Sequence, residues 1–327
     1  MGGRLDPAVA RARVAVRACL ADLDPDDLVL VGCSGGADSL ALLVAACFEA
    51  EHSGVRVGAI VVDHGLQPDS ADVAHRAAAQ AADLGAEPVR VERVHVGTEA
   101  GPEGAARTAR HAALGRAVDD LGARCALLAH TRDDQAETVL LGLSRGSGGR
   151  SLAGMRPVSG WLRRPLLGLT RADTEQVCRA SGLTWWDDPH NIDDAHARVR
   201  VRRHLLPALE RALGPGVRDA LARTADLLRA DADALDDLAA ELLVRAGTPD
   251  DLGVDVLLAA PGALRRRALR SAALAAGCPA TDLVAGHVAA IDALLTDWHG
   301  QRGVDLPARV RATREGDRLR LVARVPG

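Results

Sequence analysis

The sequence Ser34-Gly35-Gly36-Ala37-Asp38-Ser39 stands between two apolar runs, residues 28–31 and 40–43. An apolar run, a glycine turn and a second apolar run opening on Asp-Ser are typical of a buried strand that leads into a helix. The N-terminus of a helix presents unpaired backbone N–H groups and a partial positive charge, so it binds phosphate readily. We therefore predict a nucleotide-binding loop between a strand and a helix of an α/β fold.

Each residue type of this loop suits phosphate binding. Gly35 and Gly36 can adopt positive φ angles and, having no Cβ, let the backbone approach a ligand closely. Ser34 and Ser39 add hydroxyl donors, and Asp38 is suited to hold Mg²⁺ against phosphate oxygens. The chain contains no lysine, which excludes both the P-loop lysine of ordinary NTPases and Schiff-base chemistry. The loop is therefore expected to differ from the P-loop.

Composition narrows the class of protein. At 327 residues the chain is long enough for two domains with cores of their own. It shows no run of about 18 apolar residues and no leader with a cleavage site, so we expect a cytoplasmic protein that makes no membrane contact. The six cysteines form no C-x-x-C pair, which argues against a zinc knuckle, an iron–sulfur cluster and a disulfide framework.

The formal net charge of −4 offers no global field that would attract a nucleic acid. Any polyanion site must therefore come from local arginine clusters, which lie at residues 198–203, 265–270 and 309–314. Each cluster is either such a site or the ordinary decoration of a helix face in an arginine-rich chain.

The first part of the chain alternates strand and helix patterns. Expected strands are 28–31, 55–62, 89–94 and 125–129, with a further one at 161–164; expected helices are 38–51, 71–84, 104–121, 133–143 and 170–181. This alternation predicts a doubly wound parallel sheet in a catalytic domain spanning residues 1–213. Ligands of such sheets lie at the carboxyl ends of the strands.

The rhythm changes after residue 216. Amphipathic patterns at 217–246, 262–276 and 284–296 predict helices, and a short β-like tail closes the chain at 304, 310 and 319–322. We therefore expect a mostly helical second domain over residues 217–327.

A second motif, residues 130–138, follows the fourth expected strand. Thr131 or Asp133 can cap a helix here, and Asp134 and Glu137, three residues apart, share one helical face. This pair could hold Mg²⁺ or the ammonium of an amine substrate, although two acids are also an ordinary start of a solvated helix. His130 is either a phosphate contact or general base, or a structural residue.

Taken together, these motifs resemble the tRNA(Ile)-lysidine synthetase family of the PP-loop ATP-pyrophosphatase superfamily. The matching segments, in family order, are 34–39, 62–66, 106–110, 130–138, 145–148, 164–167, 188–191 and 198–207. The remainder of the chain is similar only in length and helical character, as in the short form of the family with one C-terminal domain. The resemblance implies an adenine nucleotide alpha-hydrolase-like fold.

The resemblance also implies a reaction. ATP, with Mg²⁺, adenylates the carbonyl oxygen of the wobble cytidine in an isoleucine tRNA with a CAU anticodon. The ε-amine of L-lysine then attacks the activated ring carbon, AMP leaves, and lysidine is formed. Adenylation makes a poor leaving group into a good one, which agrees with a loop that holds pyrophosphate. Whether the protein is a homodimer is left open.

Site residues are carried over from the family by position. The loop from Ser34 to Ser39, Ala37 included, is similar to the family's ATP site, with Asp38 and Asp134 at its metal. Asp63, His64 and His130 resemble residues that line the nucleotide site. Three further groups resemble catalytic residues of the family: Glu137 at the lysine, the arginine pair Arg107 and Arg110, and the mobile Arg202.

Two further segments are given roles outside catalysis. Arg198 and Arg200 are candidates for tRNA phosphate contacts. Asp188, Pro189 and Asn191 are better explained as the brace of a turn than as catalytic groups.

Three alternatives remain open at this stage. A tRNA thiolase of the same superfamily would share the loop but usually has paired cysteines. An amidating synthetase of the NAD or GMP type would share it as well, yet fits residues 130–137 and 198–207 poorly. A catalytically idle tRNA-binding module would bind tRNA without turning ATP over to AMP.

Overall fold

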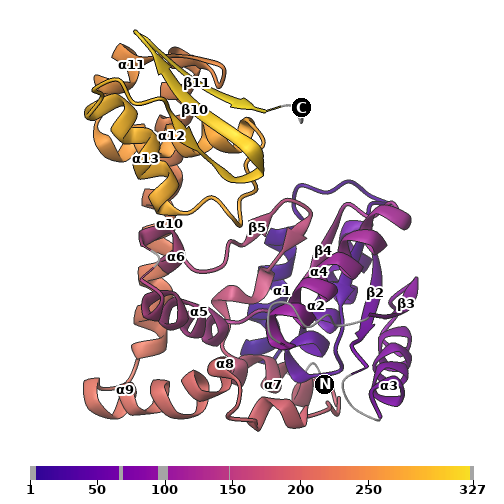
Figure 1. The fold of residues 1–327 in the computed structure, drawn as a ribbon. Helices are drawn as coiled ribbons and strands as arrows, with labels where there is room; N and C mark the ends of the chain where they lie inside the picture. The colour runs from indigo at the N-terminus through magenta and orange to yellow at the C-terminus, as the bar shows by residue number, and fades with distance from the viewer. Residues whose placement is uncertain (1–4, 66–68, 95–101, 147, 325–327) are drawn as a thin grey trace. The chain divides into compact units, whose positions relative to one another are not determined.

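The computed structural model describes residues 5–65, 69–94, 102–146 and 148–324. The chain divides into two compact units, Met1–Leu228 and Arg229–Gly327 (Figure 1). Within the described ranges, no helix combines the length and the apolar character needed to cross a membrane.

The first unit is built on a six-stranded sheet in the order β3-β2-β1-β4-β6-β5. All neighbours pair in parallel except β5, which runs antiparallel to β6 at the edge. The strands are β1 Leu28–Gly32, β2 Arg56–Asp63, β3 Val89–Arg93, β4 Cys125–Leu127, β5 Val158–Ser159 and β6 Leu162–Arg163. The prediction of a doubly wound parallel sheet is confirmed.

Helices cover both faces of this sheet because its strands alternate buried side chains between two apolar clusters. Val29 and Val31 of β1 belong to the cluster that also contains residues of α1, α2, α3 and α7. Leu28 and Leu30 belong to the cluster that contains α4. The helices are α1 Pro7–Leu20, α2 Ala37–Ser53, α3 Ser70–Asp83, α4 Pro102–Asp120, α5 Arg132–Ser144, α6 Gly149–Leu152 and α7 Arg171–Ala180. Helix α1 is absent from the sequence-based expectations.

The strand order places the site. The chain first proceeds from β1 to β2 and β3, then crosses back to β4 on the other side of β1. The loops after β1 and β4 therefore meet at the carboxyl edge, where the order reverses and where such sheets bind ligands. These two loops carry the two motifs of the sequence.

Short elements then lead to the second unit. They are η1 Pro165–Gly168, η2 Pro189–Ile192, α8 Ala197–Arg200, η3 Val201–Leu205 and α9 Leu206–Leu213. Helix α10, Val217–Ala246, begins in the first unit and ends in the second.

The second unit packs α11 Val254–Leu258, α12 Gly262–Ala275 and α13 Ala285–Thr296 in one buried cluster with a five-stranded sheet. The sheet order is β7-β8-β11-β10-β9, with strands β7 Gly247–Thr248, β8 Asp251–Gly253, β9 Val304–Asp305, β10 Val310–Glu315 and β11 Arg318–Ala323. The three last strands correspond to the expected β-like tail, and β7 and β8 are additional.

Candidate active site

The phosphate loop leaves β1 and turns directly into α2. The backbone N–H of Ser34 donates to Oγ of Ser39 at 3.1 Å, and that hydroxyl donates to the carbonyl oxygen of Gly36 at 2.9 Å. Gly36 occupies the N-cap position of α2, where it has no side chain to cap the helix. The first N–H groups of α2 are therefore left for an anion, as the sequence predicts.

Gly35 is required by the shape of the loop. Its φ angle is +78°, a left-handed conformation that other residues adopt only with strain, and an added Cβ would lie 3.2 Å from the Cβ of Ala77. Its carbonyl oxygen accepts the backbone N–H of Trp186 at 2.9 Å. The loop is thus packed on both sides by α3 and by the segment before η2.

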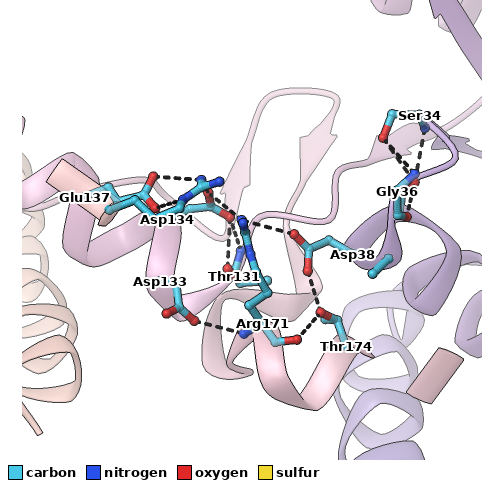
Figure 2. A network of polar contacts seen from close by, with 12 residues as sticks. Ser34, Gly36, Asp38, Thr131, Asp133, Asp134, Glu137, Arg171 and Thr174 are labelled. Atoms are coloured by element: carbon cyan, nitrogen blue, oxygen red, sulfur yellow. Dashed lines mark hydrogen bonds and ion pairs between the residues drawn. The ribbon is translucent and has the colours of Figure 1, made fainter. Parts of the chain in front are cut away.

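The second motif begins α5 with a capping box. Oδ2 of Asp134 accepts two hydrogen bonds from Thr131, one from its backbone N–H at 2.8 Å and one from its side-chain hydroxyl at 3.0 Å (Figure 2). Oδ1 of Asp134 lies 3.5 Å from Nη2 of Arg202. Arg202 also contacts Glu137, so the prediction that Asp134 and Glu137 share one helical face is confirmed.

Glu137 is fully buried and is held by two arginines. Its Oε1 accepts Nε of Arg202 at 2.5 Å, and its Oε2 accepts Nη2 of Arg202 at 3.1 Å. Nε of Arg198 lies 3.2 Å from Oε2. Arg198 also donates to the Thr138 hydroxyl at 2.9 Å, so its side chain contacts two residues of α5. The tRNA phosphate contact expected of it stays a prediction.

Arg171 and Thr174 complete the site and are absent from the residues singled out in the sequence. The Thr174 hydroxyl donates to Oδ1 of Asp38, and Nη2 of Arg171 lies 3.4 Å from Oδ2 of Asp38 and 3.9 Å from Oδ1 of Asp134. Figure 2 shows the Arg171 guanidinium between the two carboxylates. The Thr170-x-x-Asp173 capping box in the sequence indicates that helix α7 begins here, but it does not indicate that Arg171 and Thr174 belong to the site.

Burial sets the protonation behaviour of these groups. Burial raises the pKa of Glu137, and this effect exceeds the lowering by Arg202. Burial likewise raises the pKa of Asp38 by more than Arg171 and Thr174 lower it. Burial alone would also raise the pKa of Asp134, but the neighbouring His130, the Thr131 N–H and Arg171 together outweigh it and lower that pKa.

His130 is neutral in this environment. Burial among positive groups such as Arg110 lowers its pKa to about 3. Its Nδ1 is buried and has no hydrogen-bond partner among the described residues. A neutral imidazole with a vacant nitrogen can donate or accept one hydrogen bond from a ligand.

A cavity of about 890 Å³ unites the two motifs, and its size suits a nucleotide. Every predicted residue of the phosphate loop except Gly35 lines it. The other residues predicted to be catalytic or nucleotide-binding that line it are Asp63, His64, Arg110, His130, Asp134 and Arg202, whereas Glu137 is not part of the lining. Arg198, Asp188 and Asn191 line it as well. Arg107 lies in α4, but its side chain is outside the described part of the structure.

Two of the predicted residues support turns. Oδ1 of Asp63 accepts the N–H of Gly65 at 2.9 Å, which fixes the turn after β2. Oδ1 of Asp188 accepts the N–H of His190 at 2.9 Å and caps η2, so the prediction of a braced turn at 188–191 is confirmed.

The donor set of the cavity fits Mg²⁺ bound together with phosphate. Asp38 and Asp134 each direct one carboxylate oxygen toward the Arg171 guanidinium, so a cation is already accommodated between them. Mg²⁺ is commonly held by one or two carboxylates plus substrate phosphates and keeps several waters. Among the described residues, no group of three His, Cys, Asp or Glu could hold a metal by itself.

Comparison with known proteins identifies the family. A PP-loop domain model matches residues 10–209, and a TilS substrate binding domain model matches residues 252–320. The tRNA(Ile)-lysidine synthase of Thermobifida fusca is 52% identical, with 96% of this chain and 97% of that protein covered. The chain belongs to the tRNA(Ile)-lysidine synthase family. The tRNA(Ile)-lysidine synthase of Leifsonia xyli is 55% identical over 91% of this chain and 90% of its own.

Membership of the tRNA(Ile)-lysidine synthase family agrees with the resemblance predicted from the motifs. Among solved structures, the U34-tRNA thiolase NcsA of Methanococcus maripaludis matches with a TM-score of 0.56 and 20% identity, covering 68% of this chain and 80% of the thiolase. At that identity the likeness shows a shared fold alone. The thiolase alternative therefore gains no support beyond the fold.

Proposed function

We propose that this protein is a tRNA(Ile)-lysidine synthase, which ligates L-lysine to the wobble cytidine of the CAU anticodon of isoleucine tRNA. In the first step the cytidine carbonyl oxygen attacks the α-phosphorus of ATP, and pyrophosphate leaves. In the second step the ε-amine of lysine bonds to the activated ring carbon, a proton is lost, and AMP leaves with the former carbonyl oxygen.

One observation carries this proposal: the phosphate loop and the buried carboxylate Asp134 of α5 line one cavity. Nη2 of Arg171 is within 4 Å of both Asp38, from the phosphate loop, and Asp134, from α5. An adenylating enzyme that uses an amine needs both parts at one place, because the leaving group and the nucleophile act on the same carbon.

The loop residues are assigned to ATP. The N–H groups at the start of α2 and the Ser34 and Ser39 hydroxyls would hold the phosphates, since they face the cavity and no capping side chain competes with them. Asp38 and Asp134 would hold Mg²⁺, which supplies positive charge to the leaving pyrophosphate. Binding of that ion requires Arg171 to release or share the two carboxylates.

The carboxylates of α5 are assigned to lysine. Asp134 and Glu137 provide the negative charge that an ammonium group needs. Asp134 lines the cavity, and Glu137, which Arg202 contacts, is buried, where such an attraction is strong. Lysine can attack only as the free amine. Because burial raises the pKa of Glu137, this carboxylate is a better proton acceptor than an exposed one, and we assign the removal of the ammonium proton to it.

Arginines are assigned to the RNA and to the negative charge of the adenylate. Arg110 lines the cavity, and Arg107 precedes it by one helical turn of α4. Arg202 contacts both acids and lines the cavity, so it can move from Glu137 to a phosphate when lysine takes its place.

The test is an analysis of the product. Purified protein is incubated with ATP, Mg²⁺, L-lysine and an unmodified isoleucine tRNA transcript, and the tRNA is then digested to nucleosides for mass spectrometry. We expect lysidine to replace the wobble cytidine, with AMP and pyrophosphate formed in equal amounts. Pyrophosphate formation without lysidine would reject lysine as the nucleophile, and absence of any turnover would favour the idle tRNA-binding module.

A further inference from the structure

Two ion pairs join the first turn of α5 to the first turn of α10. Oδ1 of Asp133 lies 3.2 Å from Nε of Arg218, and Nη1 of Arg132 donates to Oδ1 of Asp219 at 2.8 Å. Each helix contributes an Arg-Asp dipeptide, and the first residue of each dipeptide pairs with the second residue of the other. We call these four residues the α5–α10 clamp.

Apolar packing and a third helix support the same junction. Leu221 of α10 packs against the small buried cluster that contains Ala136 of α5 and Leu206 of α9. Nη1 of Arg218 also donates to Oε2 of Glu210 on α9 at 2.5 Å. The start of α10 is therefore fixed to α5 and not merely adjacent to it.

The clamp is connected directly to the catalytic acids. Oδ2 of Asp133 accepts the backbone N–H of Arg171 at 2.9 Å, as Figure 2 shows. The side chain of the same Arg171 lies between Asp38 and Asp134. Asp134 follows the clamp residue Asp133 in the chain. A shift of the first turn of α10 would therefore displace Asp134 through α5 and Arg171 through its backbone.

Helix α10 connects the clamp to the second unit along the chain. Residues 217–228 of this helix belong to the first compact unit, and the remainder belongs to the unit that contains the match to the TilS substrate binding domain. The clamp is thus the point at which the helix that enters the second unit is attached to the active-site acids.

We propose that the α5–α10 clamp positions Asp134 and Arg171 for ligation, and that Arg132, Asp133, Arg218 and Asp219 are positioning residues of this enzyme. The proposal rests on the proposed function, because it concerns the geometry of that site. The Arg132–Asp219 pair separates positioning from stability best: its side chains are 33% and 43% exposed, and exposed ion pairs contribute little to stability, whereas those of Arg218 and Asp133 are 29% and 21% exposed.

The test uses charge reversal and charge exchange in the full-length protein. Arg132→Asp and Asp219→Arg each place like charges together, and the double variant restores an opposite pair. Each single variant is expected to lower kcat/KM for lysine on the order of tenfold, while Tm changes by no more than about 4 °C. The double variant is expected to recover most of that loss. Asp120→Arg is the matched control, because Asp120 is 55% exposed and accepts Nη1 of Arg90 at 3.0 Å.

Two outcomes would overturn the proposal. One is wild-type kcat/KM in both single variants. The other is a loss that follows Tm and is not recovered by the exchange, since that would indicate a purely structural role. A titration with ATP and Mg²⁺ separates this proposal from the proposed function. If the clamp positions Asp134 and Arg171 beside the phosphate loop, Asp219→Arg should also weaken the binding of ATP with Mg²⁺. A parent protein that formed no lysidine would contradict the proposed function alone, whereas unchanged ATP affinity in Asp219→Arg would reject the clamp.

Discussion

Replacing Glu137 by glutamine tests the assignment of the lysine site. Glutamine keeps the size of the side chain and removes its charge, so the change acts mainly on electrostatics. The carboxylate is fully buried and has three contacts with arginine nitrogens, two from Arg202 at 2.5 and 3.1 Å and one from Arg198 at 3.2 Å. Solvent therefore screens this interaction only weakly, through the two arginine side chains, which are each 21% exposed.

The magnitude follows from those contacts. Removing one partner of a buried ion pair costs about 3–5 kcal/mol, and the amide oxygen still accepts one hydrogen bond, so we take the lower end, about 3 kcal/mol. If the ammonium group of lysine takes the place of Arg202 at this carboxylate, lysine loses the same free energy of interaction when Glu137 becomes glutamine. At about 1.4 kcal/mol for each factor of ten, kcat/KM for lysine should fall about 100-fold.

The assay is a lysine titration at saturating ATP and tRNA, followed by a urea titration of the folded protein. Glu49→Gln is the matched control, since Glu49 is also buried and accepts two hydrogen bonds from Arg17, at 2.7 and 3.0 Å. Arg17 does not line the cavity, whereas Arg202, the partner of Glu137, does. We expect it to lower the urea midpoint without changing lysine kinetics. A kcat/KM for Glu137→Gln within about twofold of the parent value would refute the assignment.

Three further predictions concern other parts of the chain. Gly35→Ala should weaken ATP binding about tenfold, as measured by calorimetry, because φ is +78° there and a left-handed alanine costs about 1–2 kcal/mol; unchanged affinity would show that the loop relaxes freely. Arg200→Ala should weaken tRNA binding and reduce its salt slope by about 1, because Arg200 is exposed; an equal slope would remove it from the interface. Burial would raise the pKa of Asp292, but hydrogen bonds from Arg265 and Arg266 outweigh it and lower this pKa. The ionised Asp292 therefore stabilises the second unit at pH values above its ordinary pKa of 3.8, and this stabilisation is lost as the pH falls through the lowered pKa. Urea midpoints of Asp292→Asn and the parent should therefore differ at pH 7 and converge in acid, and a difference independent of pH would contradict this.

Local signals account for what the sequence predicted well. The phosphate loop and the start of α5 are each encoded within about ten consecutive residues, by a glycine turn or a capping residue next to an apolar stripe. The alternation of elements predicts a parallel sheet, and the carboxyl ends of parallel strands lie at one edge, where both motifs were expected. The strand order itself comes from the structure. The carboxylate pair of Asp134 and Glu137 was found because helical spacing alone places them on one face.

Contacts distant in sequence account for what it missed. The hydrogen bond from Thr174 to Asp38 joins residues 136 positions apart, and no local pattern indicates it. Arg198 belongs to a run of arginines whose sequence gives no sign of which member turns inward to Glu137. In the second unit, β7 contains only Gly247–Thr248, too short for an alternating pattern, and it is a strand only because it pairs with β8.

The most direct test of the central claim compares two tRNAs in one assay. Labelled L-lysine, ATP and Mg²⁺ are incubated with the protein and either the isoleucine tRNA transcript with a CAU anticodon or the methionine tRNA with the same anticodon. The account predicts ATP-dependent label in the isoleucine tRNA alone. Label in neither RNA would contradict ligation of lysine, and equal label in both would contradict the proposed specificity for isoleucine tRNA.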